Sequence, residues 1–120
     1  MLYIPRVADK PIVWVGSSLG AVRAFPADAR RAAGYQLRRV QFGLMPSDHK
    51  PLPSISSGVL EIRIHTRTEH RIVYLAKFEE VVYVLHAFEK KTRKTSRADI
   101  ALVRDRLGQV AALRRPNKER

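Results

Sequence analysis

The chain lacks several features that would define its class at once. It has no cysteine, which excludes a disulfide framework and a thiolate metal site. Its histidines, His49, His65, His70 and His86, do not have the spacing of metal ligands. The opening residues MLYIPRVADKP are too few and too polar for a signal peptide or a membrane span. We therefore expect a cytoplasmic protein that uses no metal, no small-molecule cofactor and no membrane.

Acidic residues are also scarce. The 120 residues include 11 Asp and Glu against 23 Lys and Arg, which gives a formal charge of +12. A charge of this size favours binding to phosphate backbones or acidic partners, although a basic surface that only keeps the protein soluble would have the same composition. The length fits one domain with one core. We expect this domain over residues 1–113, followed by a basic, frayed tail over residues 114–120.

The first half of the chain predicts one strand and two helices. A strand over residues 11–15 precedes a short helix, which starts at a serine N-cap and ends before Pro26, because proline disfavours helix in the preceding residue. Pro26 suits the first turn of a second helix. Residues 45–58 contain three prolines and several small polar residues, which predicts a loop. The buried stripe of the second helix is predicted to be Ala29, Ala33, Leu37, Val40 and Leu44.

The second half predicts three strands and a final helix. The strands cover residues 59–65, 70–78 and 81–88, and their connections are so short that neighbouring strands must be antiparallel. Ser96 and Asp99 form a capping box at the start of the last helix. Apolar residues continue along that helix at helical spacing: Ile100, Val103, Leu107 and Val110.

Alternation along the strands places two arginines together. If Ile62 pairs with Ile72, Arg63 lies directly opposite Arg71 on the other face of the sheet. Opposed like charges are unfavourable unless an anion lies between them, which would make the pair a phosphate site. The alternative is that both arginines pair with surface acids, where such pairs contribute little. The acids in question are Glu61, Glu69, Glu79 and Glu80.

The last strand runs into a dense group of cations. Simple alternation puts Val82, Val84, His86 and Phe88 on one face. Within this apolar run, His86 is either a core histidine bonded to a backbone carbonyl or a group that moves protons near neutral pH. The cations that follow are Lys90, Lys91, Arg93, Lys94 and Arg97. A strand that ends in such a cluster is suited to binding a polyanion, and RNA is the one we expect.

These residues resemble a known family. The pattern E-I-R-I, R-I-V-Y and V-L-H-A-F-x-K-K-T-x-K-T over residues 61–95 closely resembles the RelE/ParE superfamily of bacterial toxins, in particular the phage-derived HigB-like branch. The resemblance extends over about residues 10–107. It implies an α+β RelE-like toxin fold, with an antiparallel four-stranded sheet, two N-terminal helices and one C-terminal helix. It also implies the toxin of a type II toxin–antitoxin pair, which cleaves messenger RNA on the ribosome without a metal.

The resemblance also implies roles for individual residues. Arg71 corresponds to the family's strand arginine that stabilises the phosphate, and Arg63 to the basic residue on the preceding strand. Lys90 and Lys91 fall where RelE-like toxins contact the scissile phosphate. RelE-type enzymes carry a tyrosine after this segment that is missing here, so His86 or a lysine is the candidate for proton transfer. The candidates for RNA binding are Arg67, Lys77, Phe88, Arg93, Lys94 and Arg97.

The expected partners are the ribosome, messenger RNA and a helix-turn-helix antitoxin protein. Two other functions fit the same fold, since fold alone does not decide function. One is a ParE-like toxin that poisons DNA gyrase. The other is a toxin-derived module that binds nucleic acid or protein but cleaves weakly or not at all.

Overall fold

The computed structural model describes residues 9–116, in which five strands and three helices are present. The strands are β1 (Ile12–Trp14), β2 (His49–Pro51), β3 (Val59–His65), β4 (Glu69–Leu75) and β5 (Val82–Glu89). The helices are α1 (Ser18–Arg23), α2 (Ala27–Gln41) and α3 (Arg97–Leu113). The predicted α+β class is confirmed, with two helices before the main strands and one after them.

The sheet differs from the predicted four-stranded antiparallel sheet in two respects. It has five strands in the order β1-β5-β4-β3-β2, and β1 is parallel to β5 while the other pairs are antiparallel. The additional strand, β2, lies in the segment predicted to be a loop. Pro51 is tolerated there because β2 is an edge strand, where a missing N–H removes no hydrogen bond to a further neighbour.

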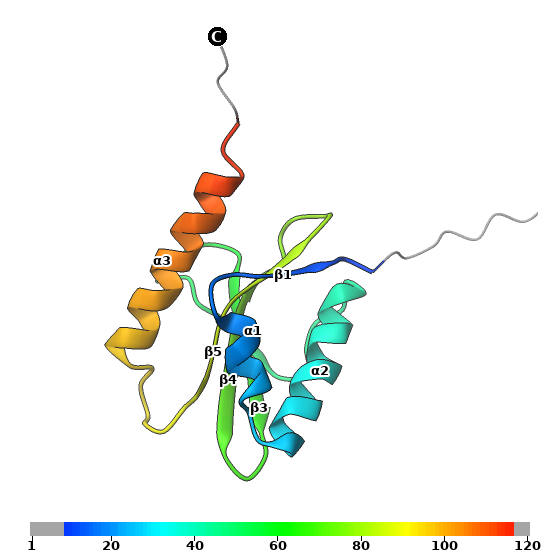
Figure 1. The fold of residues 1–120 in the computed structure, drawn as a ribbon, viewed down its shortest axis with the longest axis vertical. Helices are drawn as coiled ribbons and strands as arrows, with labels where there is room; N and C mark the ends of the chain where they lie inside the picture. Colours follow the sequence, from blue (N-terminus) through cyan, green and yellow to red (C-terminus); the bar gives the residue numbers. More distant parts are fainter. Residues whose placement is uncertain (1–8, 117–120) are drawn as a thin grey trace, which may run out of the picture.

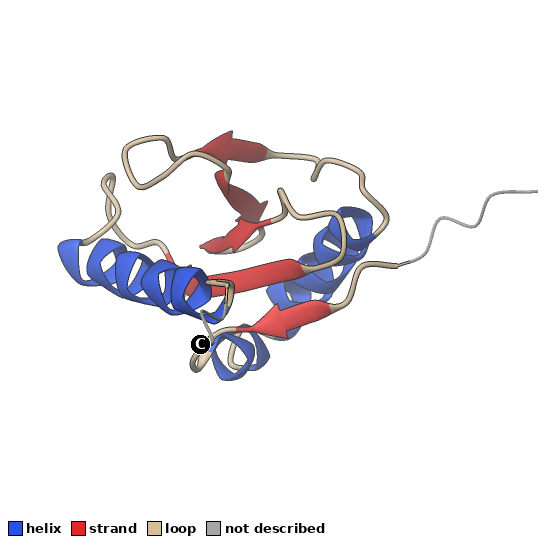
Figure 2. Ribbon diagram, turned by 90° about the horizontal axis from the view of Figure 1, so that it is seen from above, coloured by secondary structure: helices blue, strands red, loops and turns tan. Residues whose placement is uncertain are grey.

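Helices cover the sheet on both faces, so two apolar clusters replace the single core expected from length. One cluster joins α1 and α2 to residues such as Ile62, Ile72 and Val84. The other lies under α3 and includes Val73 and Val103. Figure 1 shows α3 on one side of the central strands and α2 on the other, and Figure 2 shows the helices outside the twisted layer of strands from above. We refer to these sides as the α1–α2 face and the α3 face.

The helices begin and end close to the predicted residues. The stripe of α2 is buried from Ala29 to Val40, as predicted, but the helix ends at Gln41. Gly43, at φ 81°, then turns the chain in the left-handed region, so Leu44 lies beyond the helix and is 52% exposed instead of buried. In α3, the predicted capping box is confirmed, because the backbone N–H of Asp99 donates to Ser96 Oγ over 3.0 Å.

A β-bulge in β5 changes which side chains share a face. Val84 is opposite Tyr74, but the next pair is His86 opposite Val73, so Leu85 is an extra residue. Beyond the bulge, His86 and Phe88 lie on the α3 face, whereas Val84 lies on the α1–α2 face. The predicted simple alternation of β5 is therefore wrong past Val84. The bulge is held by Arg106, which is buried in α3 and donates to the Leu85 carbonyl over 2.9 Å.

The expected tail begins with a residue that is attached to the body of the protein. Arg114 pairs with Glu80 at 2.9 Å, donates to the Tyr83 hydroxyl and lies 3.6 Å above the centre of the Phe78 ring. Residues 117–120, the last four of that tail, and residues 1–8 lie outside the described part of the chain. Within residues 9–116, no helix has both the length and the apolar character needed to cross a membrane.

Candidate nucleic-acid interface

The two strand arginines are paired as the alternation predicts, but carboxylates lie beside them. Arg63 is directly opposite Arg71 across β3 and β4. Arg71 Nη1 donates to Glu69 Oε1 over 2.9 Å, and Arg71 Nε lies 3.7 Å from Glu61 Oε1. Arg63 is 38% exposed and lies 3.9 Å from Asp48. In the free protein, carboxylates beside both arginines thus offset the repulsion between Arg63 and Arg71, which we expected an RNA phosphate to offset.

Glu61 and Arg71 form a buried ion pair instead of a surface pair of little importance. Each exposes only 7% of its side chain. Burial raises the pKa of Glu61 above its ordinary value, and Arg71, followed by Lys90, is the strongest influence that opposes the rise. Glu61 also lines a cavity of about 100 Å³ under the start of α3, together with Phe88 and Thr95. This carboxylate therefore combines a basic neighbourhood with access to a small cavity.

A second polar network connects the edge of the sheet to the same region. His65 lies between two carboxylates, with Nε2 at 2.5 Å from Asp48 Oδ2 and Nδ1 at 2.8 Å from Glu69 Oε1. The hydrogen bond to Asp48, and then that to Glu69, raise the pKa of His65, and the same contacts lower the pKa of each carboxyl group. Glu69 thus joins His65 to Arg71.

His86 is buried, as the core alternative expects, but its hydrogen-bond partner is a carboxylate and not a backbone carbonyl. It exposes 9% of its side chain, and Nε2 lies 2.7 Å from Asp99 Oδ1. The other carboxylate oxygen of Asp99 accepts a 2.6 Å hydrogen bond from Ser96 Oγ. The ring stacks on Phe88, and Nδ1 is buried without a hydrogen-bond partner among the described residues. His86 therefore links the end of β5 to the start of α3, on either side of the cation cluster.

We call residues 90–97 the basic loop. Lys90 is held at its start, because its backbone N–H donates to the Glu69 carbonyl over 2.7 Å and its Nζ donates to the Arg93 carbonyl over 2.5 Å. The other four cations of the loop are exposed: Lys91, Arg93, Lys94 and Arg97. The loop borders a cavity of about 210 Å³ that shares Phe88 and Thr95 with the cavity beside Glu61.

Two of the predicted RNA-binding residues lie elsewhere. Arg67 is in the β3–β4 turn and lines a hollow with Arg31 at the start of α2. Lys77 follows β4, about six residues beyond Arg71, which corresponds to roughly 20 Å of extended chain. Phe88, Arg93, Lys94 and Arg97 lie at or near the basic loop, as do Lys90 and Lys91. Nine of the eleven predicted side chains therefore lie in one region, with Arg67 and Lys77 outside it.

Three acids that the sequence did not assign to the site join this group: Glu61 and Glu69, named only as possible partners of the arginines, and Asp99, named only for the capping box. The signal for Glu61 was present, since alternation along β3 puts it on the same face as Arg63. Among residues 9–116, no group of three or more His, Asp or Glu side chains is arranged to hold a metal ion. The site consists of cations, carboxylates and one aromatic ring, an arrangement suited to phosphate binding and proton transfer.

The family model described as Phage derived protein Gp49-like (DUF891) matches residues 21–108, which is well over half of the chain. The chain belongs to this Gp49-like family. The family is associated with RelE/ParE-like toxins, so the toxin superfamily expected from the sequence is supported at this coarser level. The matched range includes β2 to β5, the basic loop and most of α3, and thus the whole candidate site described above. No curated protein matches the chain.

Proposed function

We propose that this protein is the toxin of a type II toxin–antitoxin system, a ribosome-dependent messenger-RNA endoribonuclease of the HigB-like kind. In this proposal it acts in the cytoplasm and is neutralised by a helix-turn-helix antitoxin. Membership of the Gp49-like family supports the toxin class. The observation that carries the cleavage activity is Glu61, a buried carboxylate beside Arg71 on the face that leads to the basic loop.

The proposed reaction is the attack of an RNA 2′-hydroxyl on the adjacent phosphorus. Glu61 accepts the hydroxyl proton as the 2′ oxygen bonds to phosphorus, and the bond to the 5′ oxygen breaks. That leaving oxygen takes a proton from the ammonium group of Lys90 or Lys91. The products are a 2′,3′-cyclic phosphate and a 5′-hydroxyl, and no further reactant is required. Burial assists this step, because a carboxyl group with a raised pKa is a stronger base near neutral pH.

Arg71 and Arg63 are assigned to the charge on the phosphate. The Arg71 guanidinium now donates to Glu69, whose side chain is 41% exposed, so an incoming phosphate would replace the Glu69 carboxylate on the same donor. Arg63 lies opposite and is exposed enough to contact a second phosphate oxygen. Phe88 lines both cavities and is the aromatic surface on which a base would stack.

A translation extract tests this proposal. Purified protein added to ribosomes and a defined message should produce cuts at codon boundaries, and the same message without ribosomes should stay intact. An intact message in both arms would contradict cleavage. A supercoiling assay with DNA gyrase belongs in the same experiment, because inhibition of gyrase with an intact message would select the ParE-like function instead.

A second candidate function is favoured by one observation. The Glu61–Arg71 pair is so deeply buried that it is also typical of an ion pair that only maintains the fold. In that case the basic loop would bind RNA electrostatically, and the protein would be a module that binds without cutting. Binding to ribosomes that falls steeply with added salt, together with intact message, would be the result of that function.

A further inference from the structure

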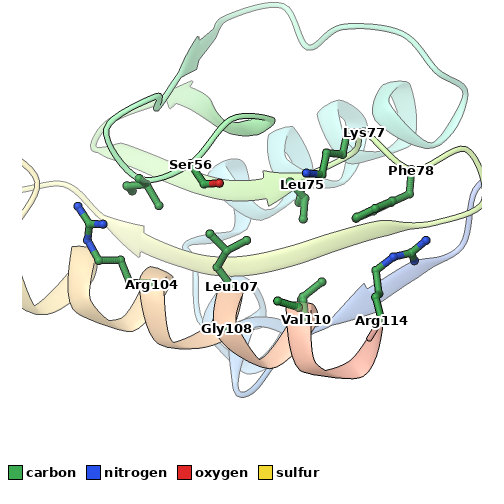
Figure 3. Close-up of a pocket in the computed structure, with 11 residues that line it drawn as sticks. Ser56, Leu75, Lys77, Phe78, Arg104, Leu107, Gly108, Val110 and Arg114 are labelled. Carbon is green, nitrogen blue, oxygen red and sulfur yellow. The ribbon is translucent and has the colours of Figure 1, made fainter. Parts of the chain in front are cut away.

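A groove lies at the opposite end of α3 from the basic loop. It has a volume of about 660 Å³ and runs between the C-terminal half of α3 and the chain that follows β4. Figure 3 shows Leu107 and Val110 on the α3 side pointing toward Leu75 and Phe78 across the groove. The floor is therefore apolar, and none of the roles proposed for RNA cleavage uses it.

Cations surround this apolar floor. Figure 3 shows Arg104 and Arg114 toward the two ends of the α3 side, with Lys77 on the opposite side. No Asp or Glu is present among the described residues that line the groove. Within residues 9–116, Lys77 and Arg104 have no carboxylate within 4.0 Å, whereas Arg114 pairs with Glu80. Arg104 Nη2 donates to the Ser54 carbonyl over 3.3 Å, which leaves its charge without a carboxylate partner. The groove therefore has two cations whose charge an acidic group of a partner could pair with.

The position of Lys77 is set by the backbone beneath it. Gly58 has a φ of 85°, and a Cβ at this position would lie 2.9 Å from Lys77 Cδ. The lysine stem thus packs directly on the Gly58 backbone, which leaves its ammonium group beside Phe78, with Nζ 5.5 Å from the ring centre. A charge held at the edge of an apolar surface favours a partner that presents an acid beside apolar side chains.

The sheet excludes one common way of binding a peptide here. Among the described residues that line the groove, only Leu75 belongs to a strand; it is the last residue of β4, an inner strand, and it pairs with β3 on one side and with β5 on the other. A partner therefore cannot extend the sheet with its own backbone, as it could at the edges formed by β1 and β2. A helix satisfies its own backbone groups and contacts a groove through side chains alone.

We propose that this groove binds an acidic amphipathic helix of a partner protein. The apolar side chains of that helix fill the space between Leu107 and Phe78, and its Asp or Glu residues face Lys77 and Arg104. The proposal rests on the groove and its charges, and it does not depend on RNA cleavage. It also moves Lys77 from the RNA-binding residues to the surface that binds a protein.

A glycine in the groove provides a variant that tests this without damage to the core. Gly108 lies in α3 and lines the groove, and a Cβ at this position meets nothing within 4 Å. Gly108→Leu should therefore fill the groove and leave the fold intact. Gly34→Leu is the matched control, since Gly34 is also a helical glycine in open space but lies on α2, against the other face of the sheet.

The experiment uses a displayed library of helical peptides with leucine fixed at positions i, i+3, i+4 and i+7. The flanking positions allow Glu, Gln or Lys, and selection is carried out on the wild-type protein. Glu should be enriched at the flanks, and the selected peptide should bind Gly108→Leu at least about tenfold more weakly and Gly34→Leu unchanged. Lys77→Glu and Arg104→Glu should each weaken binding about two- to fivefold, while Arg23→Glu on α1 has no effect.

Three results would overturn the proposal. The first is enrichment of Lys or Gln instead of Glu at the flanks. The second is equal binding of the selected peptide to the Gly108→Leu and Gly34→Leu proteins, both of which circular dichroism should show to be folded. The third is binding that is lost on substitution of Lys91 and Lys94, which would place the peptide on the basic loop.

Discussion

Replacing Arg71 with glutamine is expected to destabilise the protein far more than replacing Glu61, although the two side chains form one buried ion pair. Their surroundings are not equivalent. Without Glu61, Arg71 keeps its 2.9 Å contact with Glu69. Without Arg71, the buried Glu61 carboxylate has no cation within 4.0 Å among the described residues. Leaving the buried Glu61 charge unpaired costs more free energy than removing that charge.

The expected magnitudes follow from this difference. Arg71→Gln should reduce the free energy of unfolding by about 3–5 kcal/mol at neutral pH, because it leaves the buried carboxylate without its partner. Glu61→Gln should change that free energy by no more than about 1 kcal/mol, because removing a buried charge offsets the loss of its attraction to Arg71. The double variant should then be at least about 2 kcal/mol more stable than Arg71→Gln alone.

The dependence on pH provides an internal check. Since the pKa of Glu61 is raised in the folded protein above its ordinary 4.5, its contribution to stability is fully present below 4.5 and is lost as the pH rises through the folded-state value. Arg71→Gln removes the strongest influence that lowers this pKa. The variant should therefore be most destabilised at pH 7 and should recover part of the loss as the pH falls toward 4.5.

Urea denaturation followed by circular dichroism measures all three variants, with Arg63→Gln as the matched control. Arg63 lies directly opposite Arg71 but is 38% exposed, so its replacement should change stability by less than about 1 kcal/mol. The reasoning fails if Arg71→Gln changes stability no more than Arg63→Gln does. It also fails if the effects of Glu61→Gln and Arg71→Gln add within about 0.5 kcal/mol.

Three further predictions concern stability and can be measured by the same denaturation assay. Gly108→Ala should stabilise the protein by about 0.5–1 kcal/mol, because alanine favours a helix. Gly16→Ala should destabilise it, because Gly16 has a φ of 57° and a new Cβ would lie 2.6 Å from Arg106 Nε. The opposite signs would contradict the backbone described. Ser96→Ala should cost about 0.5–2 kcal/mol through loss of the N-cap of α3, and no loss would mean that the cap is not formed in solution. The pKa of His65 is raised above 6.5, and the pKa values of its two carboxyl partners, Asp48 and Glu69, are lowered below 3.8 and 4.5. The stabilisation that these contacts give the folded protein is therefore present from about pH 4.5 to pH 6.5. It is lost as the pH rises through the folded-state pKa of His65 or falls through the folded-state pKa values of the two carboxyl groups. The stability difference between wild type and His65→Gln should therefore be largest near pH 5–6, and a difference that does not vary with pH would contradict this.

Local patterns were sufficient to predict most of the fold. The α2 stripe from Ala29 to Val40, the capping box at Ser96 and the opposition of Arg63 and Arg71 each depend on neighbouring residues or on one strand pair, and each is confirmed, whereas Leu44, the last residue predicted for the stripe, lies beyond the helix. The bulge at Leu85 could not be predicted, because it depends on Arg106, a residue far along the chain that binds the Leu85 carbonyl. A prediction that lacks the bulge therefore places the side chains of His86 and Phe88 on the wrong face of the sheet.

The candidate site was predicted less completely for a similar reason. Alternation places Glu61 and Arg63 on one face of β3, but it does not show that α3 covers Glu61 and leaves Arg63 half-exposed. Burial by a distant helix is what distinguishes a surface ion pair from a buried one with a raised pKa. The charges of the basic loop were visible in the sequence, whereas the small cavity that connects them to Glu61 depends on the packing of α3.

The most direct test of the proposed function compares Glu61→Gln with Glu79→Gln in a ribosome-dependent cleavage assay. The two substitutions are chemically identical, but Glu79 is exposed, lies in the connection between β4 and β5, and lines neither the cavity beside Glu61 nor the cavity of the basic loop. If Glu61 is the general base, Glu61→Gln should cleave the message about 10²–10⁴-fold more slowly while Glu79→Gln cleaves at the wild-type rate. Equal cleavage by wild type and a folded Glu61→Gln protein would contradict the account.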